Sequence, residues 1–203
     1  MNAKQYKVKF IEALETIYGF DEAESFFYLI LEDKFQMKRL DLALDPAFEF
    51  SADALNVWEE LVTQLKTEIP IQYLLGNTEF FGLSFLVNEN VLIPRPETEE
   101  LVDWIIEEEK KMERLKDREI EGLKDRGIER HRDVKILDIG TGSGCIAISL
   151  AKNIPKATVF AIDVSAKALE VAKKNGEINK VSVTFLEKNI LETDDLLEQF
   201  DII

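Results

Sequence analysis

The chain has 203 residues, 46% of them hydrophobic, which is enough to bury a core in one large domain or two small ones. Its 40 acidic and 25 basic residues give a formal net charge of −15, which opposes binding to a nucleic-acid backbone. One cysteine and one histidine exclude an intramolecular disulfide and argue against a metal site, and no apolar stretch fits a membrane span or a secretion signal, so we expect a cytoplasmic protein.

Residues 1–70 predict a small all-α bundle of three amphipathic helices, because apolar residues recur there at helical spacing. Gly19 ends the first helix, and Asp21 with Glu24 forms a capping box for the second. Ser51 is expected to cap the third helix.

Residues 71–93 change to short apolar runs rich in β-forming residues, with Gly82 near the middle. We interpret this range as a hairpin that links two domains. Its aromatic residues Phe80, Phe81 and Phe85 are expected to pack in a core or between domains, although a ligand platform is the alternative.

A turn with two prolines follows at residues 94–98 and fixes the directions of Arg95 and Glu97, with Thr98 in the same supporting loop. A helix with an apolar face comes next. The charged range of about 113–131 then predicts a solvated, partly helical insertion that carries no site.

The last 70 residues alternate strand and helix, and the final FDII predicts the start of a further strand. This order predicts an α/β fold with a doubly wound parallel sheet.

The first of these strands ends in an acidic and glycine-rich segment. Asp138 stands at its carboxyl end, followed by Gly140, Gly142 and Gly144, and we call residues 140–144 the glycine loop. A dinucleotide fingerprint needs its third glycine where this chain has Cys145. A carboxylate beside the loop disfavours a pyrophosphate and favours a cationic group, and S-adenosylmethionine carries an ammonium and a sulfonium. The loop therefore favours S-adenosylmethionine, while a purely loop-ordering role for Asp138 stays open.

Two later strand ends carry further polar side chains. Asp163 ends the second strand, where a carboxylate can accept both hydroxyls of a ribose, in a methyl donor or in NAD alike. After the third strand, Asn189 would bond the edge of an adenine and Ile190 would pack on its face, with ordinary turn residues as the alternative.

The segments IPRPETEELVDWI, ILDIGTGSGCIAISLAK and AIDVSAKALEVAKKN resemble the release factor glutamine N5-methyltransferases, the PrmC/HemK family. The resemblance extends over nearly the whole chain. It implies a Rossmann-like class I methyltransferase domain over residues 94–203, with an incomplete sheet, preceded by a helical bundle that recognises the substrate protein. It also implies methyl transfer from S-adenosylmethionine to the side-chain amide of the glutamine in the Gly-Gly-Gln loop of peptide chain release factors, the proteins of translation termination.

Site residues are carried over by the motif match alone. In that match the methionine moiety would contact Asp138, Gly140, Thr141, Gly142, Ser143 and Gly144. The ribose would contact Asp163, and the adenine would contact Asn189 and Ile190. An aspartate is common in the family where this chain has Asn189, so the hydrogen bond to the adenine amine is a departure.

A larger departure concerns the family's Asn-Pro-Pro-Tyr motif, which does not occur in the 203 residues. In the family this motif holds the substrate amide, so no catalytic residue is assigned within the chain. We therefore expect a fragment that binds cofactor weakly and lacks turnover.

Three other functions stay open at this stage. Methylation of a nucleic-acid base would use similar chemistry, but it needs a basic groove that the net charge of −15 opposes. A non-catalytic protein-binding module would use residues 1–70 to dock a partner. An oxidoreductase would bind NADH at the glycine loop.

Overall fold

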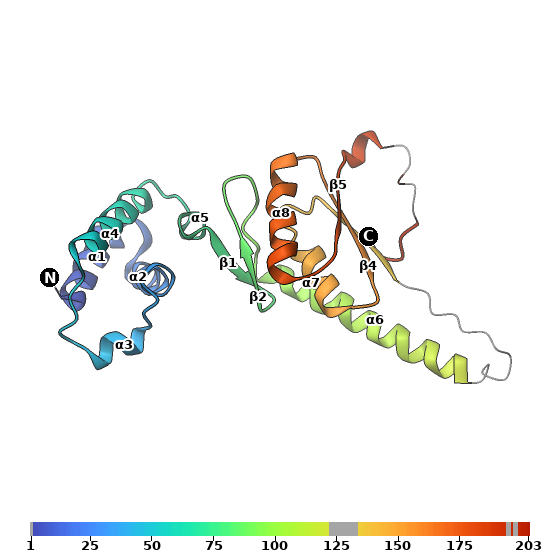
Figure 1. Cartoon of the computed structure of the whole chain (residues 1–203), viewed down its shortest axis with the longest axis horizontal. Coiled ribbons are helices and arrows are strands. Elements are labelled where there is room, and N and C mark those ends of the chain that lie inside the picture. The colour runs from blue at the N-terminus through green and yellow to red at the C-terminus, as the bar shows by residue number, and fades with distance from the viewer. Residues whose placement is uncertain (1, 122–133, 194–195, 197–198) are drawn as a thin grey trace. The chain divides into compact units, whose positions relative to one another are not determined.

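The computed structural model describes residues 2–121, 134–193, 196 and 199–203. The chain divides into two compact units, Met1–Gly76 and Asn77–Ile203, which we call the helical unit and the sheet unit (Figure 1). Within the described ranges, no helix is both long and apolar enough to cross a bilayer.

The helical unit has an aromatic core. Its helices are α1 (Ala3–Tyr18), α2 (Phe20–Phe35), α3 (Arg39–Leu44), α4 (Ala52–Leu65) and α5 (Ile71–Leu75). Trp58 of α4 is fully buried, and its ring stacks on the rings of Phe27 and Phe35 at centroid distances of 4.9 and 5.4 Å. Such pairs contribute about 0.5–1.5 kcal/mol each beyond the apolar area they bury. The amphipathic faces predicted for this range therefore meet around one indole ring.

Two of the predicted helix boundaries need separate comment. Ser51 caps α4 as expected, because its hydroxyl accepts the Ala54 N–H at 3.2 Å. The capping box of Asp21 with Glu24 is wrong: α2 begins one residue after Gly19, which has φ +81° and no side chain to cap with. The glycine both ends α1 and opens α2, so the second helix starts before the acidic residues.

A β-hairpin opens the sheet unit, with β1 (Asn77–Phe80) antiparallel to β2 (Leu83–Leu86). Its turn is the pair Phe81 and Gly82, with φ +51° and +68°, which matches the right-handed twist of the strands. Glu99 stabilises the turn, because its carboxylate accepts the Phe81 N–H at 2.9 Å.

The hairpin is shorter than the predicted range 71–93. Residues 71–75 form α5 instead, because Pro70 starts a helical turn and Gly76, at φ +81°, ends it. Phe80 and Phe85 are buried in the core of the sheet unit, as expected for packing residues.

Helix α6 (Glu97–Glu121) follows the proline turn and is longer than the predicted helix. It takes in the first part of the charged range 113–131. The rest of that range lies largely outside the described residues.

A parallel sheet forms the body of the sheet unit, as predicted. Its elements are β3 (Lys135–Ile139), α7 (Cys145–Asn153), β4 (Thr158–Asp163), α8 (Ala166–Asn179), β5 (Thr184–Glu187) and the short 3-10 helix η2 (Ile190–Glu192). The strand order is β3-β4-β5, and Ile202 adds a parallel bridge to Ile136 on the free side of β3. The order of strands therefore reverses beside β3, and this is where open α/β sheets bind their ligands.

Candidate cofactor site

The glycine loop connects β3 to α7 at the reversal of strand order. Its three glycines, Gly140, Gly142 and Gly144, have φ of +75°, +55° and +81°, a region that residues with a Cβ enter only at a cost. The loop is fixed to the neighbouring strand, because the N–H groups of Gly140 and Thr141 both donate to the Ile162 carbonyl, at 2.9 and 3.1 Å. The loop therefore has a defined conformation before any ligand binds.

Gly144 is also required by packing. A Cβ at this position would lie 2.9 Å from Cδ1 of Ile148 and 3.2 Å from Cβ of Ala172. The glycine lets α7 and α8 approach each other directly beneath the loop.

Asp138 is half-buried at the end of β3, and its carboxylate accepts the Thr141 hydroxyl at 2.7 Å. Burial raises the pKa of this carboxyl, and the charge of Asp163 raises it further. The hydrogen bonds from the Thr141 hydroxyl and the Ala147 N–H act to lower the same pKa. Asp138 therefore has the loop-ordering role that the sequence left open. It is also a partly desolvated carboxylate that a cationic ligand group would stabilise.

Asp163, at the end of β4, holds the loop from the other side. One of its oxygens accepts the Gly142 N–H and the other accepts the Ser165 N–H, each at 2.9 Å. The sequence predicted contacts between this carboxylate and ribose hydroxyls. Each carboxylate oxygen has a second lone pair, so the two loop bonds leave acceptor capacity for such hydroxyls.

The sequence reading missed Asn175 of α8, which is fully buried. Its Oδ1 accepts the Leu86 N–H at 2.7 Å, and its Nδ2 donates to the Leu86 carbonyl at 3.0 Å and to the Ser143 carbonyl at 2.9 Å. Asn179, one turn later, donates to the Ser84 carbonyl at 2.9 Å. One amide therefore ties the glycine loop and strand β2 to the same helix.

A signal for Asn175 does exist in the sequence. Ala168, Val171 and Ala172 form the apolar face of α8, and both Asn175 and Asn179 continue that face at helical spacing. An amide on a buried face must find hydrogen-bond partners, so the pattern indicates a structural link even though it does not name the partners.

Asn189 and Ile190 are half-buried after β5. Oδ1 of Asn189 accepts the Leu191 N–H at 3.0 Å and so caps η2, which is the turn role given as the alternative. Three apolar side chains at the carboxyl edge of the sheet are exposed: Ile139 at 40%, Val164 at 64% and Leu191 at 91%.

Comparison with known proteins assigns the family. The sequence matches the family model of the PrmC N-terminal domain over residues 9–76 and that of the methyltransferase small domain over residues 123–203. A release factor glutamine methyltransferase from Flavobacterium psychrophilum is 56% identical over 203 residues, which is 100% of this chain and 66% of that protein. The chain belongs to the release factor glutamine methyltransferase family. The family predicted from the three sequence segments is thereby confirmed.

A second family member, from Bacteroides thetaiotaomicron, is 38% identical over 193 residues, which is 95% of this chain and 62% of that protein. The chain thus spans about two thirds or less of the length of the curated relatives it matches. Among solved structures, a tRNA (uracil-54, C5)-methyltransferase from Pyrococcus abyssi has a TM-score of 0.43 and 23% identity, over 62% of this chain and 26% of that one.

The predicted supporting loop is only partly a loop, because Glu97 and Thr98 form the first turn of α6 and only Arg95 precedes the helix. Arg95 and Glu97 are exposed and Thr98 is half-buried, with its N–H donating to the Arg95 carbonyl at 3.0 Å. In the described part of the chain, no hydrogen bond joins these three residues to the glycine loop. Their predicted role beside the site stays a prediction.

Cys145 is the first residue of α7, directly after the loop. Burial raises the pKa of its thiol to about 11, against hydrogen bonds that act to lower it, so the helix N-terminus does not produce a thiolate. Cys145 is therefore a packing residue. Among the described residues, no group of three or more His, Cys, Asp or Glu side chains is placed to hold a metal ion.

Proposed function

We propose that the chain binds S-adenosylmethionine at the glycine loop and forms part of an enzyme that methylates the side-chain amide of a release-factor glutamine. The observation that carries the proposal is the half-buried Asp138 carboxylate at the end of β3, hydrogen-bonded to Thr141 of a fixed glycine loop at the reversal of strand order. The names of the relatives from Flavobacterium and Bacteroides support the substrate.

Each part of the site matches one part of the cofactor. The charge of Asp138 would attract the α-ammonium group. The N–H groups of Gly140, Thr141, Gly142 and Gly144 already donate to protein acceptors, so the Ser143 N–H is the loop donor that would receive the carboxylate. The spare lone pairs of Asp163 would accept the ribose hydroxyls, and Asn189 with Ile190 would contact the adenine. The cofactor supplies the methyl group, and these residues orient it.

The substrate side of the reaction makes a separate demand. An amide nitrogen is a weak nucleophile, so it must be aligned with the methyl group while acceptors hold its protons. The 203 residues contain no Asn-Pro-Pro-Tyr segment to provide those acceptors. We therefore expect these residues, tested alone, to bind cofactor with little or no turnover.

We assign recognition of the release factor to residues 1–70, which lie in the helical unit. Arg95 in the proline turn, with Glu97 and Thr98 at the start of α6, would support the site. A cytoplasmic location is part of the same proposal, because release factors act during translation.

Calorimetry with S-adenosylhomocysteine tests the cofactor half of the proposal. Binding is expected for the 203-residue chain and should be weakened by Asp138→Asn. Binding of NADH in place of S-adenosylhomocysteine would overturn the proposal in favour of an oxidoreductase, and binding of neither would favour a non-catalytic module.

Transfer of a radiolabelled methyl group to a release factor tests the second half. The relative from Flavobacterium psychrophilum serves as the positive control. A rate for the 203-residue chain equal to that of the control would contradict the expected loss of turnover.

A further inference from the structure

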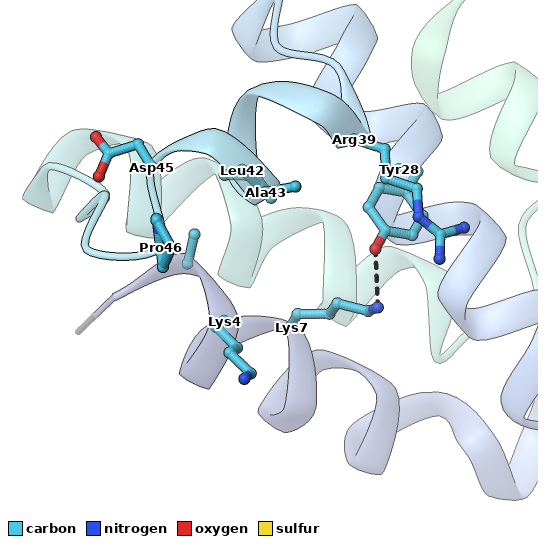
Figure 2. Close-up of a pocket in the computed structure, with 9 residues that line it drawn as sticks. Lys4, Lys7, Tyr28, Arg39, Leu42, Ala43, Asp45 and Pro46 are labelled. Atoms are coloured by element: carbon cyan, nitrogen blue, oxygen red, sulfur yellow. Dashed lines mark hydrogen bonds between the residues drawn. The ribbon is translucent and has the colours of Figure 1, made fainter.

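A pocket of about 360 Å³ lies in the helical unit (Figure 2). It is lined by Ala3, Lys4, Lys7, Tyr28, Arg39, Leu42, Ala43, Asp45 and Pro46. All of these residues belong to α1, α2, α3 and the segment after α3. We call it the Tyr28 pocket, and it shares no residue with the glycine loop.

Cationic and hydroxyl donors meet at one end of this pocket. The guanidinium carbon of Arg39 lies 4.9 Å from the centroid of the Tyr28 ring, and Lys7 Nζ donates to the Tyr28 hydroxyl at 2.9 Å (Figure 2). Lys4 lies one turn before Lys7 on α1. Glu24 pairs with Lys7 and so fixes its position.

Arg39 and Tyr28 both keep donors for a ligand. Within the part of the chain that the structure describes, no salt bridge within 4.0 Å is found for Arg39, although its charge, after the hydrogen bond from Lys7, helps to lower the pKa of Glu24. The Tyr28 hydroxyl accepts from Lys7 without donating to a described protein acceptor. A planar guanidinium that stacks on a ring still presents its fork of N–H groups at the edge. Together with the phenolic O–H, these groups form a set of donors suited to a carboxylate.

The rest of the pocket is of a different character. Leu42, Ala43 and Pro46 supply apolar surface, and the Asp45 carboxylate stands at the end away from Arg39 (Figure 2). This carboxylate repels a second negative charge and can accept a backbone N–H. The lining thus favours a ligand with one negative charge and an apolar neighbour.

We propose that the Tyr28 pocket binds an acidic side chain of a partner protein, with an apolar residue beside that side chain packed on Leu42, Ala43 and Pro46. The proposal rests on the assignment of partner recognition to residues 1–70 and names the chemistry that the bundle would recognise, and its test does not need cofactor to be bound. The net charge of −15 opposes polyanions such as nucleic acid or polyphosphate, so a single carboxylate is the anion that fits.

An NMR titration of the 203-residue chain tests whether the Tyr28 pocket binds an acidic side chain. The probe is the peptide acetyl-Leu-Glu-Leu-amide, and acetyl-Leu-Gln-Leu-amide is its neutral control. We expect the Glu peptide to shift the backbone resonances of residues 39–46 and to bind about tenfold or more tightly than the Gln peptide, as for a charge-assisted hydrogen bond.

Two variants test whether the Glu peptide binds in the Tyr28 pocket. Arg39→Gln should weaken binding of the Glu peptide by about tenfold or more. Lys9→Gln is the control, because it also removes one positive charge, but from an exposed position on α1 outside the pocket, where Lys9 Nζ lies 4.0 Å from Glu59 Oε1. It should leave binding of the Glu peptide within about twofold.

Three outcomes would overturn the proposal. The first is equal binding of the Glu and Gln peptides. The second is an equal loss from Lys9→Gln and Arg39→Gln, which would indicate a general charge effect. The third is tighter binding of inorganic phosphate or of free glutarate than of the peptide, which would make the ligand a small anion and not a protein segment.

Discussion

Replacing Asn175 by alanine should loosen the glycine loop and destabilise the sheet unit. The change leaves three backbone groups without their partner: the N–H and the carbonyl of Leu86 and the carbonyl of Ser143, which now lie 2.7, 3.0 and 2.9 Å from the amide. An unpaired buried polar group costs about 1–3 kcal/mol, and water reaches Leu86 in part, so we expect a loss of about 3–5 kcal/mol.

Asn179→Ala is the matched control. It also removes an amide from the same face of α8 that holds β2, but its Nδ2 donates to the carbonyls of Ser84 and of Asn175 and not to the glycine loop. Two neutral hydrogen bonds are lost, which should cost about 1–2 kcal/mol. Affinity for S-adenosylhomocysteine should fall about tenfold or more for Asn175→Ala and stay within about twofold for Asn179→Ala.

Hydrogen exchange followed by mass spectrometry can separate local from global effects, because each peptide reports its own opening. Peptides that cover β2 and the glycine loop should lose protection in Asn175→Ala, while peptides from α1, in the other unit, should not change. Equal protection of the loop peptides in the two variants would refute the idea that Asn175 positions the loop. Calorimetry on the same samples then reports whether the cofactor site depends on it.

Three further predictions follow from single positions. Gly144→Ala should cost about 2–4 kcal/mol of unfolding free energy in urea, since a Cβ there would lie 3.2 Å from Cβ of Ala172, which no rotamer can move, at a φ of +81°. Gly140→Ala, with nothing within 4 Å, should cost only about 1 kcal/mol of backbone strain. Burial raises the pKa of Asp138, so its ionised form destabilises the fold above the ordinary aspartate pKa and not below it. Asp138→Asn should therefore raise the urea midpoint of unfolding at about pH 7, and this gain should shrink towards about pH 4. The affinity of the same variant for S-adenosylhomocysteine should fall. Burial raises the pKa of the Cys145 thiol to about 11, so alkylation by iodoacetamide at about pH 8 should be about 100-fold slower in the folded chain than in urea. Equal rates would contradict the raised pKa.

The apolar periodicity of the helices and the alternation of strands and helices could be predicted from the sequence. Apolar spacing in residues 3–65 and the alternation after residue 134 both depend on local pattern, and local pattern decides which face of an element is buried. Gly19 and Ser51 marked helix ends correctly, because a positive φ and a capping hydroxyl are properties of one or two residues.

Features that depend on distant partners were not readable. Helices α3 and α5 have six and five residues, too few for a periodic signal. The predicted hairpin range therefore includes the residues of α5. Asp163 was assigned to a ribose, but its bonds to Gly142 and Ser165 depend on where β3 and β4 meet in space. Asn175 lies 89 positions from Leu86 in the sequence, and only the fold brings them together.

The link between α8 and the hairpin determines where this protein can be recombined with its relatives. A crossover at Gly76 transfers Asn77–Leu86 together with the amides of Asn175 and Asn179 that bond it. A crossover near residue 93 would give a chimera whose hairpin comes from one parent and whose helix comes from the other. Gly76 is therefore the better junction for exchanging helical units between members of the family.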